Sequence, residues 1–436
     1  MGIYFGTDGL RGIYGESVSP EIAFKVGNSL GRLCQKYKRI VIGRDTRKSG
    51  SLLTLAFASG IMCQGVNVYD VCVVPTPVVA YLAKNGKYDF GVVISASHND
   101  ASFNGIKIFD SEGMKLSEKL EATIERKLLY SNEVEHESVG KYFSKPVLIQ
   151  KYKRNILSNF PSLKGLKIVL DCANGATGNI AKELFGQLEA KVVALNVGRK
   201  GLDINENCGA LYPSIISEAV KKHNADMGFS FDGDGDRIIA CNEKGEILDG
   251  DDILYILSQA YPNETNIVGT SMTNSGLEQA LKKQGKNLLR ADVGDKYVVE
   301  LMKNTHSRLG GETSGHIINF DYSTTGDGVL TALTISSLAK KSNLPLSKLA
   351  NLVHFPQALI NLAVVDKYRT LNSSILSSEI LRIQREFGDN GRVLVRASGT
   401  ENKIRIMCEH KSKQVAEQNA KHLETLISNQ MFDDCH

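Results

Sequence analysis

The residues of this sequence best suited to chemistry are three aspartates that alternate with glycine in the segment FDGDGDR. In an extended loop, Asp232, Asp234 and Asp236 can converge on one cation, and hard oxygen ligands of this kind suit Mg²⁺ or Ca²⁺. Without a cation, three clustered carboxylates would repel one another, so a purely structural glycine-rich hairpin explains them less well. We therefore expect a metal site here, with Mg²⁺ as the ion.

The same spacing partly matches the Ca²⁺ loop of an EF-hand, with Glu243 at a further ligand position. Two features argue against that interpretation. The glycine that an EF-hand loop needs is replaced by Arg237, and the flanking segments MGFSF and RIIACN have the composition of strands. The sequence thus predicts a metal loop between two strands.

A second candidate loop is ISASHN, residues 94–99, which follows the apolar, β-branched run FGVVI. Such a run is typical of a buried parallel strand, and ligands of open α/β sheets lie at the carboxyl ends of strands. The residues alone make Ser95 and Ser97 equal candidates for a nucleophile. Serine and asparagine are also common in turns and helix caps, so this loop needs support from the rest of the chain.

Two further loops have the polarity of a sugar phosphate site. In GGETSGH, Glu312 can accept from two neighbouring hydroxyls and Ser314 can add a contact, although a glycine-rich turn is the simpler alternative. In RASGTENKIR, Arg396 and Arg405 flank a turn rich in hydroxyls and backbone N–H groups, which fits a phosphate dianion. The sequence contains neither a Walker loop nor G-x-G-x-x-G, so we expect the phosphate to belong to a substrate.

The elements that position these loops form an internal repeat. Three segments, beginning at residues 40, 167 and 266, share an apolar strand, a polar loop ending in Ser-Gly or Thr-Gly, an amphipathic helix and a second strand. Such a unit places two parallel strands beside each other, so we expect three related α/β domains. Residues 130–146 are polar and predict a linker or an exposed passage between helices, and a second break is expected near residues 242–250.

The tail after Pro356 has a different character. Three strand-like runs precede a long polar helix from Lys413 to about Asn429, and apolar side chains recur along one face of that helix. Those side chains are Ala416, Ala420, Leu423 and Ile427. We expect a separate α+β domain.

The composition of the whole chain fits a multidomain enzyme that acts on small anions. A length of 436 residues is too great for one ordinary core, and the net charge of +4 is small, with no basic run that would favour nucleic acid. Eight cysteines show no metal spacing, which suggests free thiols in a reducing cytoplasm. We find neither a signal peptide nor a segment long enough to span a membrane, and expect a cytoplasmic protein.

Taken together, these loops resemble the signature segments of the α-D-phosphohexomutase superfamily, in the same order and at similar spacing over the whole chain. The segments are FGTDGLRG, ISASHN, CANGATG, FDGDGDR, VGDKYV, GETSGH, TTGDG and RASGTE. The resemblance implies a heart-shaped molecule with three related α/β domains and a C-terminal α+β domain similar to the TATA-binding-protein fold. The implied domains are residues 1–145, 146–245, 246–356 and 357–436.

The resemblance also assigns roles to individual residues. Ser97 would be a phosphoserine that binds one Mg²⁺ per chain together with Asp232, Asp234 and Asp236. Positions that match those contacting the transferring group or moving protons are Arg11, His98, Lys107 and His316. Positions implied to bind substrate are Arg237, with Glu312 and Ser314 on the sugar hydroxyls, and Arg396, Ser398, Gly399, Thr400 and Arg405 on the non-reacting phosphate.

The implied enzyme is an intramolecular phosphotransferase that interconverts glucosamine 6-phosphate and glucosamine 1-phosphate through a 1,6-bisphosphate, feeding UDP-N-acetylglucosamine and cell-wall precursor synthesis. Analogy alone suggests a homodimer. An isomerase of mannose or glucose phosphates is the alternative within the superfamily, because Thr313 stands where glutamine or asparagine is usual. A non-catalytic phosphosugar-binding module is the alternative outside it, although such a module would need neither Ser97 nor the aspartates. Asp100 and Asn402 replace two usual prolines, which loosens both turns.

Overall fold

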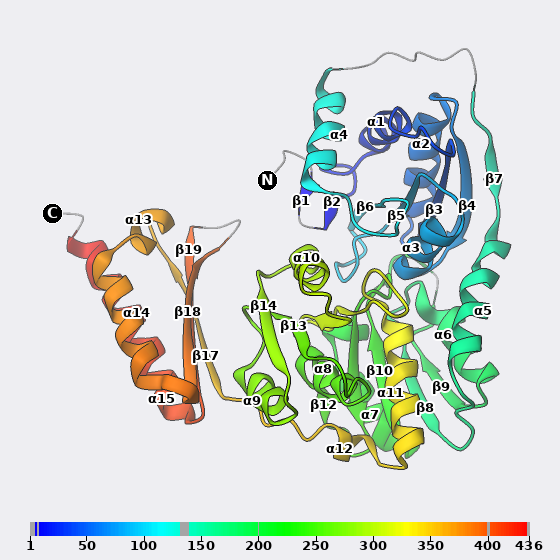
Figure 1. Cartoon of the computed structure of the whole chain (residues 1–436). Coiled ribbons are helices and arrows are strands. Elements are labelled where there is room, and N and C mark those ends of the chain that lie inside the picture. The colour runs from blue at the N-terminus through cyan, green and yellow to red at the C-terminus, as the bar shows by residue number, and fades with distance from the viewer. Residues whose placement is uncertain (1–4, 7, 131–138, 199, 399–401, 434–436) are drawn as a thin grey trace. The chain divides into compact units, whose positions relative to one another are not determined.

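The computed structural model describes residues 5–6, 8–130, 139–198, 200–398 and 402–433 (Figure 1). The chain divides into two compact units. The first contains Met1–Met272 and Lys286–Asn351, and the second contains Thr273–Gly285 and Leu352–His436. Within the described ranges, no helix is both long enough and apolar enough to cross a membrane.

The first sheet of the larger unit has seven strands in the order β1-β2-β6-β5-β3-β4-β7. The strands are β1 (Phe5–Gly6), β2 (Gly9–Ile13), β3 (Arg39–Arg44), β4 (Asn67–Val73), β5 (Phe90–Ile94), β6 (Phe103–Phe109) and β7 (Tyr142–Ser144). The helices are α1 (Pro20–Gly31), α2 (Gly50–Met62), α3 (Thr76–Asn85) and α4 (Glu118–Tyr130). All five residues of β5 are buried, and the strand lies between β3, which is parallel to it, and β6, which is antiparallel. The ISASHN loop therefore begins at the centre of this sheet.

The second sheet has the order β12-β11-β10-β8-β9. Its strands are β8 (Lys167–Asp171), β9 (Lys191–Leu195), β10 (Met227–Phe231), β11 (Ile238–Asn242) and β12 (Ile247–Leu248), with helices α5 (Ile149–Asn159), α6 (Thr177–Gln187) and α7 (Ser214–His223). β10 and β11 form an antiparallel hairpin in which both strands are fully buried. This hairpin carries the FDGDGDR loop, so the predicted strands on both sides of it are confirmed.

The third sheet has the order β14-β13-β15-β16. Its strands are β13 (Asn266–Thr270), β14 (Asn287–Ala291), β15 (Leu309–Gly311) and β16 (Ile317–Asn319). The helices that accompany it in the larger unit are α8 (Gly250–Ser258), α10 (Asp295–Thr305), α11 (Gly328–Ser342) and α12 (Leu346–Leu349). β15 and β16 are an antiparallel pair, and the GGETSGH loop joins them.

The predicted repeat is confirmed in the strand pairing. β3 with β4, β8 with β9, and β13 with β14 are parallel neighbours, and each pair is joined by one helix: α2, α6 or α9 (Ser275–Lys283). In each copy the polar loop lies between the end of the first strand and the start of the helix. The repeat therefore places three polar loops at the carboxyl ends of parallel strands.

Each of the two expected connections contains a short strand that the sequence did not predict. Of the predicted linker 130–146, residues 131–138 lie outside the described part of the chain, but Tyr142–Ser144 form β7, which is parallel to β4. The expected break near 242–250 contains β12, which pairs with β11. Both segments are polar because one face of a short edge strand is open to solvent, and a polar composition alone does not separate this case from a linker.

The smaller unit contains a three-stranded antiparallel sheet in the order β17-β19-β18. Its elements are α9, β17 (Gln357–Ala363), α13 (Lys367–Leu371), α14 (Ser374–Phe387), β18 (Gly391–Ala397), β19 (Lys403–His410) and α15 (Lys413–Asp433). The four apolar residues predicted on one face of the last helix are fully buried: Ala416, Ala420, Leu423 and Ile427. Ala420, Leu423 and Ile427 share a core with α14 and the sheet, which confirms the expected α+β organisation of the tail.

Candidate functional site

Ser97 lies in the larger unit with its hydroxyl directed at the acidic loop. Its Oγ donates to Asp232 Oδ2 at 2.5 Å, and the residue is only 1% exposed. The ring Nδ1 of His98 lies 3.4 Å from the same Oγ. The backbone of Ser97 has a φ of 53°, a left-handed conformation that costs a residue with a side chain about 1 kcal/mol or more. Such strain persists only where surrounding contacts hold the loop.

Ser95, the other candidate, has a different set of partners. Its Oγ donates to Asp45 Oδ2 at 2.6 Å and accepts the N–H of Ser97 at 2.9 Å. The hydroxyl of Ser95 is therefore occupied in holding the loop, whereas that of Ser97 reaches the carboxylates. The geometry separates two serines that the residues alone left equal.

The three aspartates converge as predicted. One carboxylate oxygen from each of Asp232, Asp234 and Asp236 lies within 4.8 Å of the others, and all three residues are buried. Oδ1 of Asp234 and Oδ1 of Asp236 are buried without a hydrogen-bond partner among the described residues. Buried carboxylate oxygens in that state are costly unless they are paired or bind a cation. The set of hard oxygen donors fits a divalent cation such as Mg²⁺.

Lys107 compensates part of this negative charge. Its Nζ donates to Asp234 Oδ2 at 2.8 Å and to Asp236 Oδ2 at 2.7 Å, and the side chain is 1% exposed. Burial disfavours the ammonium, but these carboxylates outweigh it and hold the pKa of Lys107 well above its usual range. Burial, together with repulsion from Asp236 and Asp234, raises the pKa of Asp232. The site therefore contains more negative charge than Lys107 neutralises.

A chain of ion pairs surrounds the acidic loop. Asp8 pairs with Arg11, with Lys107 at 3.4 Å and with Lys115. Lys115 also pairs with Asp295 at 2.5 Å. Arg11 donates to the side-chain oxygen of Asn99 at 3.0 Å, which connects this network of ion pairs to the serine loop.

His316 lies at the other end of this network of ion pairs, next to Asp295. Its Nε2 is 3.3 Å from Asp295 Oδ2 and accepts the N–H of Gly326 at 3.1 Å, while Nδ1 faces Asp236 Oδ1 at 3.8 Å. Burial disfavours the charged ring, but Asp295 and Asp236 outweigh it and raise the pKa of His316. By contrast, burial and the neighbouring cations Arg237 and Arg11 lower the pKa of His98 to about 4.

Sequence reasoning missed several members of this network. They are Asp8, Thr76, Lys115 and Asp295, of which Thr76 donates to Asp234 Oδ2 at 2.5 Å. Asp8 and Asp295 stand inside the quoted segments FGTDGLRG and VGDKYV, so their positions carried a signal that was not used. Lys115 stands in no such segment, and its partners are far away in the sequence.

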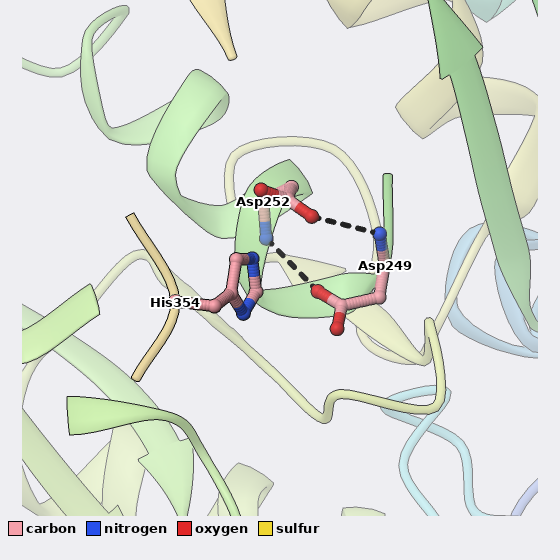
Figure 2. Close-up of side chains that lie close together, drawn as sticks. All are labelled: Asp249, Asp252 and His354. Atoms are coloured by element: carbon pink, nitrogen blue, oxygen red, sulfur yellow. Dashed lines mark hydrogen bonds between the residues drawn. The ribbon is translucent and has the colours of Figure 1, made fainter. Parts of the chain in front are cut away.

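The start of α8 supports the loop expected to contact the sugar. Asp249 and Asp252 cap the helix reciprocally, with N–H donors at 3.1 and 3.2 Å from the carboxylates (Figure 2). The N–H of Gly250 donates to the carbonyl oxygen of Thr313 at 3.0 Å. A Cβ at position 250 would lie 1.9 Å from the carbonyl oxygen of Glu312, so only glycine permits this approach.

Within that loop, Glu312 is buried and accepts the N–H of Gly294 at 3.0 Å, whereas Ser314 is exposed. The hydroxyl of Thr313 donates to Asp251 Oδ1 at 3.1 Å, so this side chain contacts the protein itself. Arg237 is half-buried, and its backbone N–H donates to Asp232 Oδ1 at 3.1 Å. The structure thus brings Arg237 next to the aspartates.

The expected phosphate loop belongs to the smaller unit. Arg396 of β18 and Arg405 of β19 are cross-strand partners, and burial together with the charge of Arg405 lowers the pKa of Arg396. Ser398 is 2% exposed, and its Oγ has no hydrogen-bond partner in the part of the chain that the structure describes. Gly399 and Thr400 lie outside the described residues. The two arginines retain a positive charge suited to an anion.

Comparison with known families shows the class to which this fold and these loops belong. Models of the phosphoglucomutase/phosphomannomutase α/β/α domains I, II and III match residues 2–135, 148–245 and 249–354. The model of the C-terminal domain of the same proteins matches residues 359–425. These matches define a phosphohexomutase and confirm the predicted fold class, three related α/β domains followed by a different C-terminal domain.

Individual relatives narrow the class. The chain is 43% identical to the phosphoglucosamine mutase of Finegoldia magna, with 98% of each chain covered. It is 41% identical to the phosphoglucosamine mutase of Bacillus subtilis, with 99% of each chain covered. The chain therefore belongs to the phosphoglucosamine mutase family, and it is an enzyme that acts as a mutase of the isomerase class.

Solved structures agree at the level of the fold. A phosphoglucomutase/phosphomannomutase family protein from Burkholderia thailandensis has a TM-score of 0.82 at 22% identity, with 98% of this chain and 97% of that chain covered. The Aspergillus fumigatus N-acetylphosphoglucosamine mutase, solved with GlcNAc-6P and magnesium, has a TM-score of 0.68 at 17% identity over 98% and 96% of the two chains. At these identities the likeness shows a shared fold only.

Proposed function

We propose that this enzyme interconverts glucosamine 6-phosphate and glucosamine 1-phosphate, with Ser97 carrying the phosphoryl group and a 1,6-bisphosphate as the intermediate. The observation that carries this proposal is the 2.5 Å contact between Ser97 Oγ and Asp232 within a buried cluster of three aspartates. A serine used only for structure would not need to be placed against carboxylates whose charge is only partly neutralised. The amino sugar follows from the names of the relatives.

In the proposed mechanism, Asp232, Asp234 and Asp236 would hold Mg²⁺ together with the phosphorylated Ser97. The ion, when bound, neutralises negative charge on the transferring phosphoryl group. The chain itself supplies a buried site that positions the serine. Phosphoryl transfer leaves little scope for covalent catalysis, so the positions and charges of the surrounding groups should account for most of the rate enhancement.

The surrounding residues divide into cations and a proton carrier. Lys107 is held as an ammonium by its carboxylate partners, and we assign it and Arg11 to neutralising the transferring group. His316 is the better candidate to take up and release the proton of the sugar hydroxyl, because its ring faces Asp295 and Asp236, which raise its pKa above its ordinary value. His98, whose pKa is lowered to about 4, would stay neutral beside Ser97.

We assign recognition of the sugar to Glu312, Ser314 and Arg237. The non-reacting phosphate would bind to the segment that carries Arg396, Ser398, Gly399, Thr400 and Arg405. The 1,6-bisphosphate has one phosphate at each end, so one anion site and one hydroxyl-reading loop can serve it in both orientations. The buried hydroxyl of Ser398, which has no partner in the described ranges, and two cross-strand arginines support the phosphate assignment.

We also propose a cytoplasmic location. Every cysteine in the described ranges is a free thiol, and five of the seven are buried. Free thiols in these numbers are typical of a reducing compartment.

The choice of sugar is tested by comparing turnover on the 6-phosphates of glucosamine, glucose and mannose, each with Mg²⁺. We expect the highest kcat/KM with glucosamine 6-phosphate. A higher value with glucose or mannose 6-phosphate would replace the proposal with a phosphoglucomutase or phosphomannomutase. The position to examine in that case is Thr313, whose hydroxyl donates to Asp251.

A further inference from the structure

Arg47, from the first polar loop of the repeat, is buried beneath the loop that carries Ser97. Its side chain is fully buried, and its Nε donates to Asp45 Oδ2 at 2.9 Å. Its Nη2 donates to the carbonyl oxygens of Ser97 at 3.0 Å and Asn99 at 2.7 Å. Its Nη1 donates to the carbonyl oxygens of Phe103, at 2.9 Å, and Asp100.

This set of contacts uses the full hydrogen-bonding capacity of the guanidinium, which has five N–H donors and no acceptor. A buried arginine with all of its donors occupied has none left for a substrate phosphate. What it holds is the backbone of one short loop, from Ser97 to Phe103. Arg47 therefore acts on the reaction only through the position of that loop.

Asn205 holds the same loop from a different part of the chain. Its Nδ2 donates to the carbonyl oxygens of Ser97 and Asn99, both at 2.9 Å, and the residue is 6% exposed. Its own backbone N–H donates to the carbonyl oxygen of Ala173 at 2.9 Å, in the CANGATG segment. Two carbonyl groups of the serine loop are thus each held by both Arg47 and Asn205.

The same contacts connect the serine loop to the acidic loop. The N–H of Ala176, also in the CANGATG segment, donates to the carbonyl oxygen of Gly233 at 2.8 Å. Gly233 lies so close to the serine loop that a Cβ there would be 2.7 Å from the carbonyl oxygen of Ser97. Asn205 therefore bridges the loop of Ser97 and the segment that supports the aspartates.

We propose that Arg47 and Asn205 are positioning residues, which fix Ser97 relative to Asp232, Asp234 and Asp236 for phosphoryl transfer. The inference rests on the proposed role of Ser97. Ser97 has a strained backbone and would carry a doubly charged phosphoryl group, so its loop needs contacts that prevent relaxation. A small displacement of a reacting group lowers the rate of transfer without changing how the substrate binds.

The sharpest test compares Asn205→Gly with Asn207→Gly. Both asparagines have a left-handed backbone, with φ of 58° and 50°, so glycine is tolerated at both, but Asn207 is exposed. We expect Asn205→Gly to lower kcat by about 10- to 100-fold and to leave KM for the sugar phosphate within about twofold. Asn207→Gly should leave both unchanged.

Two results for this pair would overturn the inference: a kcat for Asn205→Gly within about twofold of that for Asn207→Gly, or a rise in KM at constant kcat. The phosphate content of Ser97, read by intact mass, separates the inference from the proposed function. Phosphate on Ser97 with slow turnover in Asn205→Gly supports the inference. An absence of phosphate from wild-type Ser97 under turnover would instead contradict the proposed function.

A second pair of variants decides the matter if Asn205→Gly does not fold. Arg47→Lys keeps the charge beside Asp45 but cannot supply five donors, whereas Arg44→Lys changes an arginine of the same segment that pairs with Asp70 at 2.9 Å. With rates normalised to folded protein, we expect kcat to fall by about tenfold or more in Arg47→Lys relative to Arg44→Lys. Equal rates for the two would overturn the inference.

Discussion

Two serines at strand ends, Ser97 and Ser398, are both buried, but they stand in opposite surroundings. The hydroxyl of Ser97 donates to Asp232, and the carbonyl group of Ser97 is held by Arg47. The hydroxyl of Ser398 has no partner among the described residues, and it stands next to two arginines of the same charge on paired strands. The loop of Ser97 is thus held by several hydrogen bonds, whereas the described part of the Ser398 segment keeps one hydroxyl without a partner.

The difference matches two different tasks. A group that forms and breaks a covalent bond must be fixed before the substrate arrives, because a rate depends steeply on geometry. A site that binds a phosphate must instead keep charge and donors free for the ligand, since groups already paired in the protein have nothing to offer. On this account, the Ser97 region determines the rate of phosphoryl transfer, and the Arg396 region determines the affinity for the sugar phosphate.

The largest expected effect comes from removing a carboxylate of the acidic loop. Asp232→Asn keeps the shape of the side chain and an acceptor, but it removes one of three mutually repelling charges. We expect turnover to fall by about a thousandfold, equivalent to about 4 kcal/mol, and Mg²⁺ affinity to fall with it. Calorimetric titration with Mg²⁺ and an activity assay would measure both.

The stability of the same variant provides its control. Burial and the neighbouring carboxylates raise the pKa of Asp232, so its charge destabilises the metal-free fold. The melting temperature of Asp232→Asn without metal should therefore equal or exceed that of the wild type. A melting temperature several degrees lower would show that the aspartate stabilises the fold and would contradict our interpretation of the loop.

A smaller effect, on affinity, is expected in the other region. Arg396→Gln removes one of two like charges on paired strands, so stability should not fall. Loss of a charge-assisted hydrogen bond of about 1.5–3 kcal/mol should raise KM for the sugar phosphate by about 10- to 100-fold, with a smaller change in kcat. Steady-state kinetics would show the split.

Arg392 of the same strand is the matched control for Arg396. It pairs with the fully buried Glu409 at 3.0 Å, so Arg392→Gln should lower the melting temperature. Its KM should stay near the wild-type value. If Arg396→Gln behaved like Arg392→Gln, the proposed phosphate site would be a structural element instead.

The smallest effect concerns a carboxylate buried for structural reasons. Asp327 caps α11 and accepts from Tyr152 at 2.6 Å, and burial raises its pKa from 3.8 to about 6. Its charge therefore destabilises the fold above pH 6, and this cost disappears as the pH falls toward 4. The free energy of unfolding of the wild type, relative to Asp327→Asn, should fall by about 3 kcal/mol at most as the pH rises from about 4 to about 6.

Urea unfolding across this pH range would measure the difference. Tyr152→Phe removes a donor that lowers the pKa of Asp327, so it should shift the transition to higher pH. A difference that does not depend on pH would show that Asp327 does not titrate in this range. Asp327 thus serves as the reference for the two regions, because it shows how a buried carboxylate with a structural role changes the free energy of unfolding with pH.

The sequence predicted those parts of the molecule that depend on local pattern. The three parallel strand pairs, the strands around the acidic loop and the buried face of α15 follow from apolar periodicity, which records local burial. The hydroxyl-bearing loop was found because it follows the apolar run of β5. Resemblance to a family, and not the residues alone, selected Ser97 over Ser95.

The sequence did not predict the contacts that join distant segments. Lys115 pairs with Asp8 and Asp295, and Asn205 reaches the carbonyl group of Ser97, across separations of roughly a hundred residues or more. Such pairs leave no periodic pattern, because each is one polar residue in an otherwise ordinary loop. The short strand β7, within the segment expected to be a linker, was missed for a related reason, since its edge position lets it be polar.

The most direct test of the central claim is the phosphorylation state of Ser97. Intact mass and phosphopeptide mapping would be applied to the wild type, Ser97→Ala and Ser95→Ala after incubation with a hexose 1,6-bisphosphate. We predict one phosphate on the wild type and on Ser95→Ala, and neither phosphate nor mutase turnover with Ser97→Ala, which should still fold. Turnover retained by Ser97→Ala, or phosphate mapped to another residue, would contradict the account.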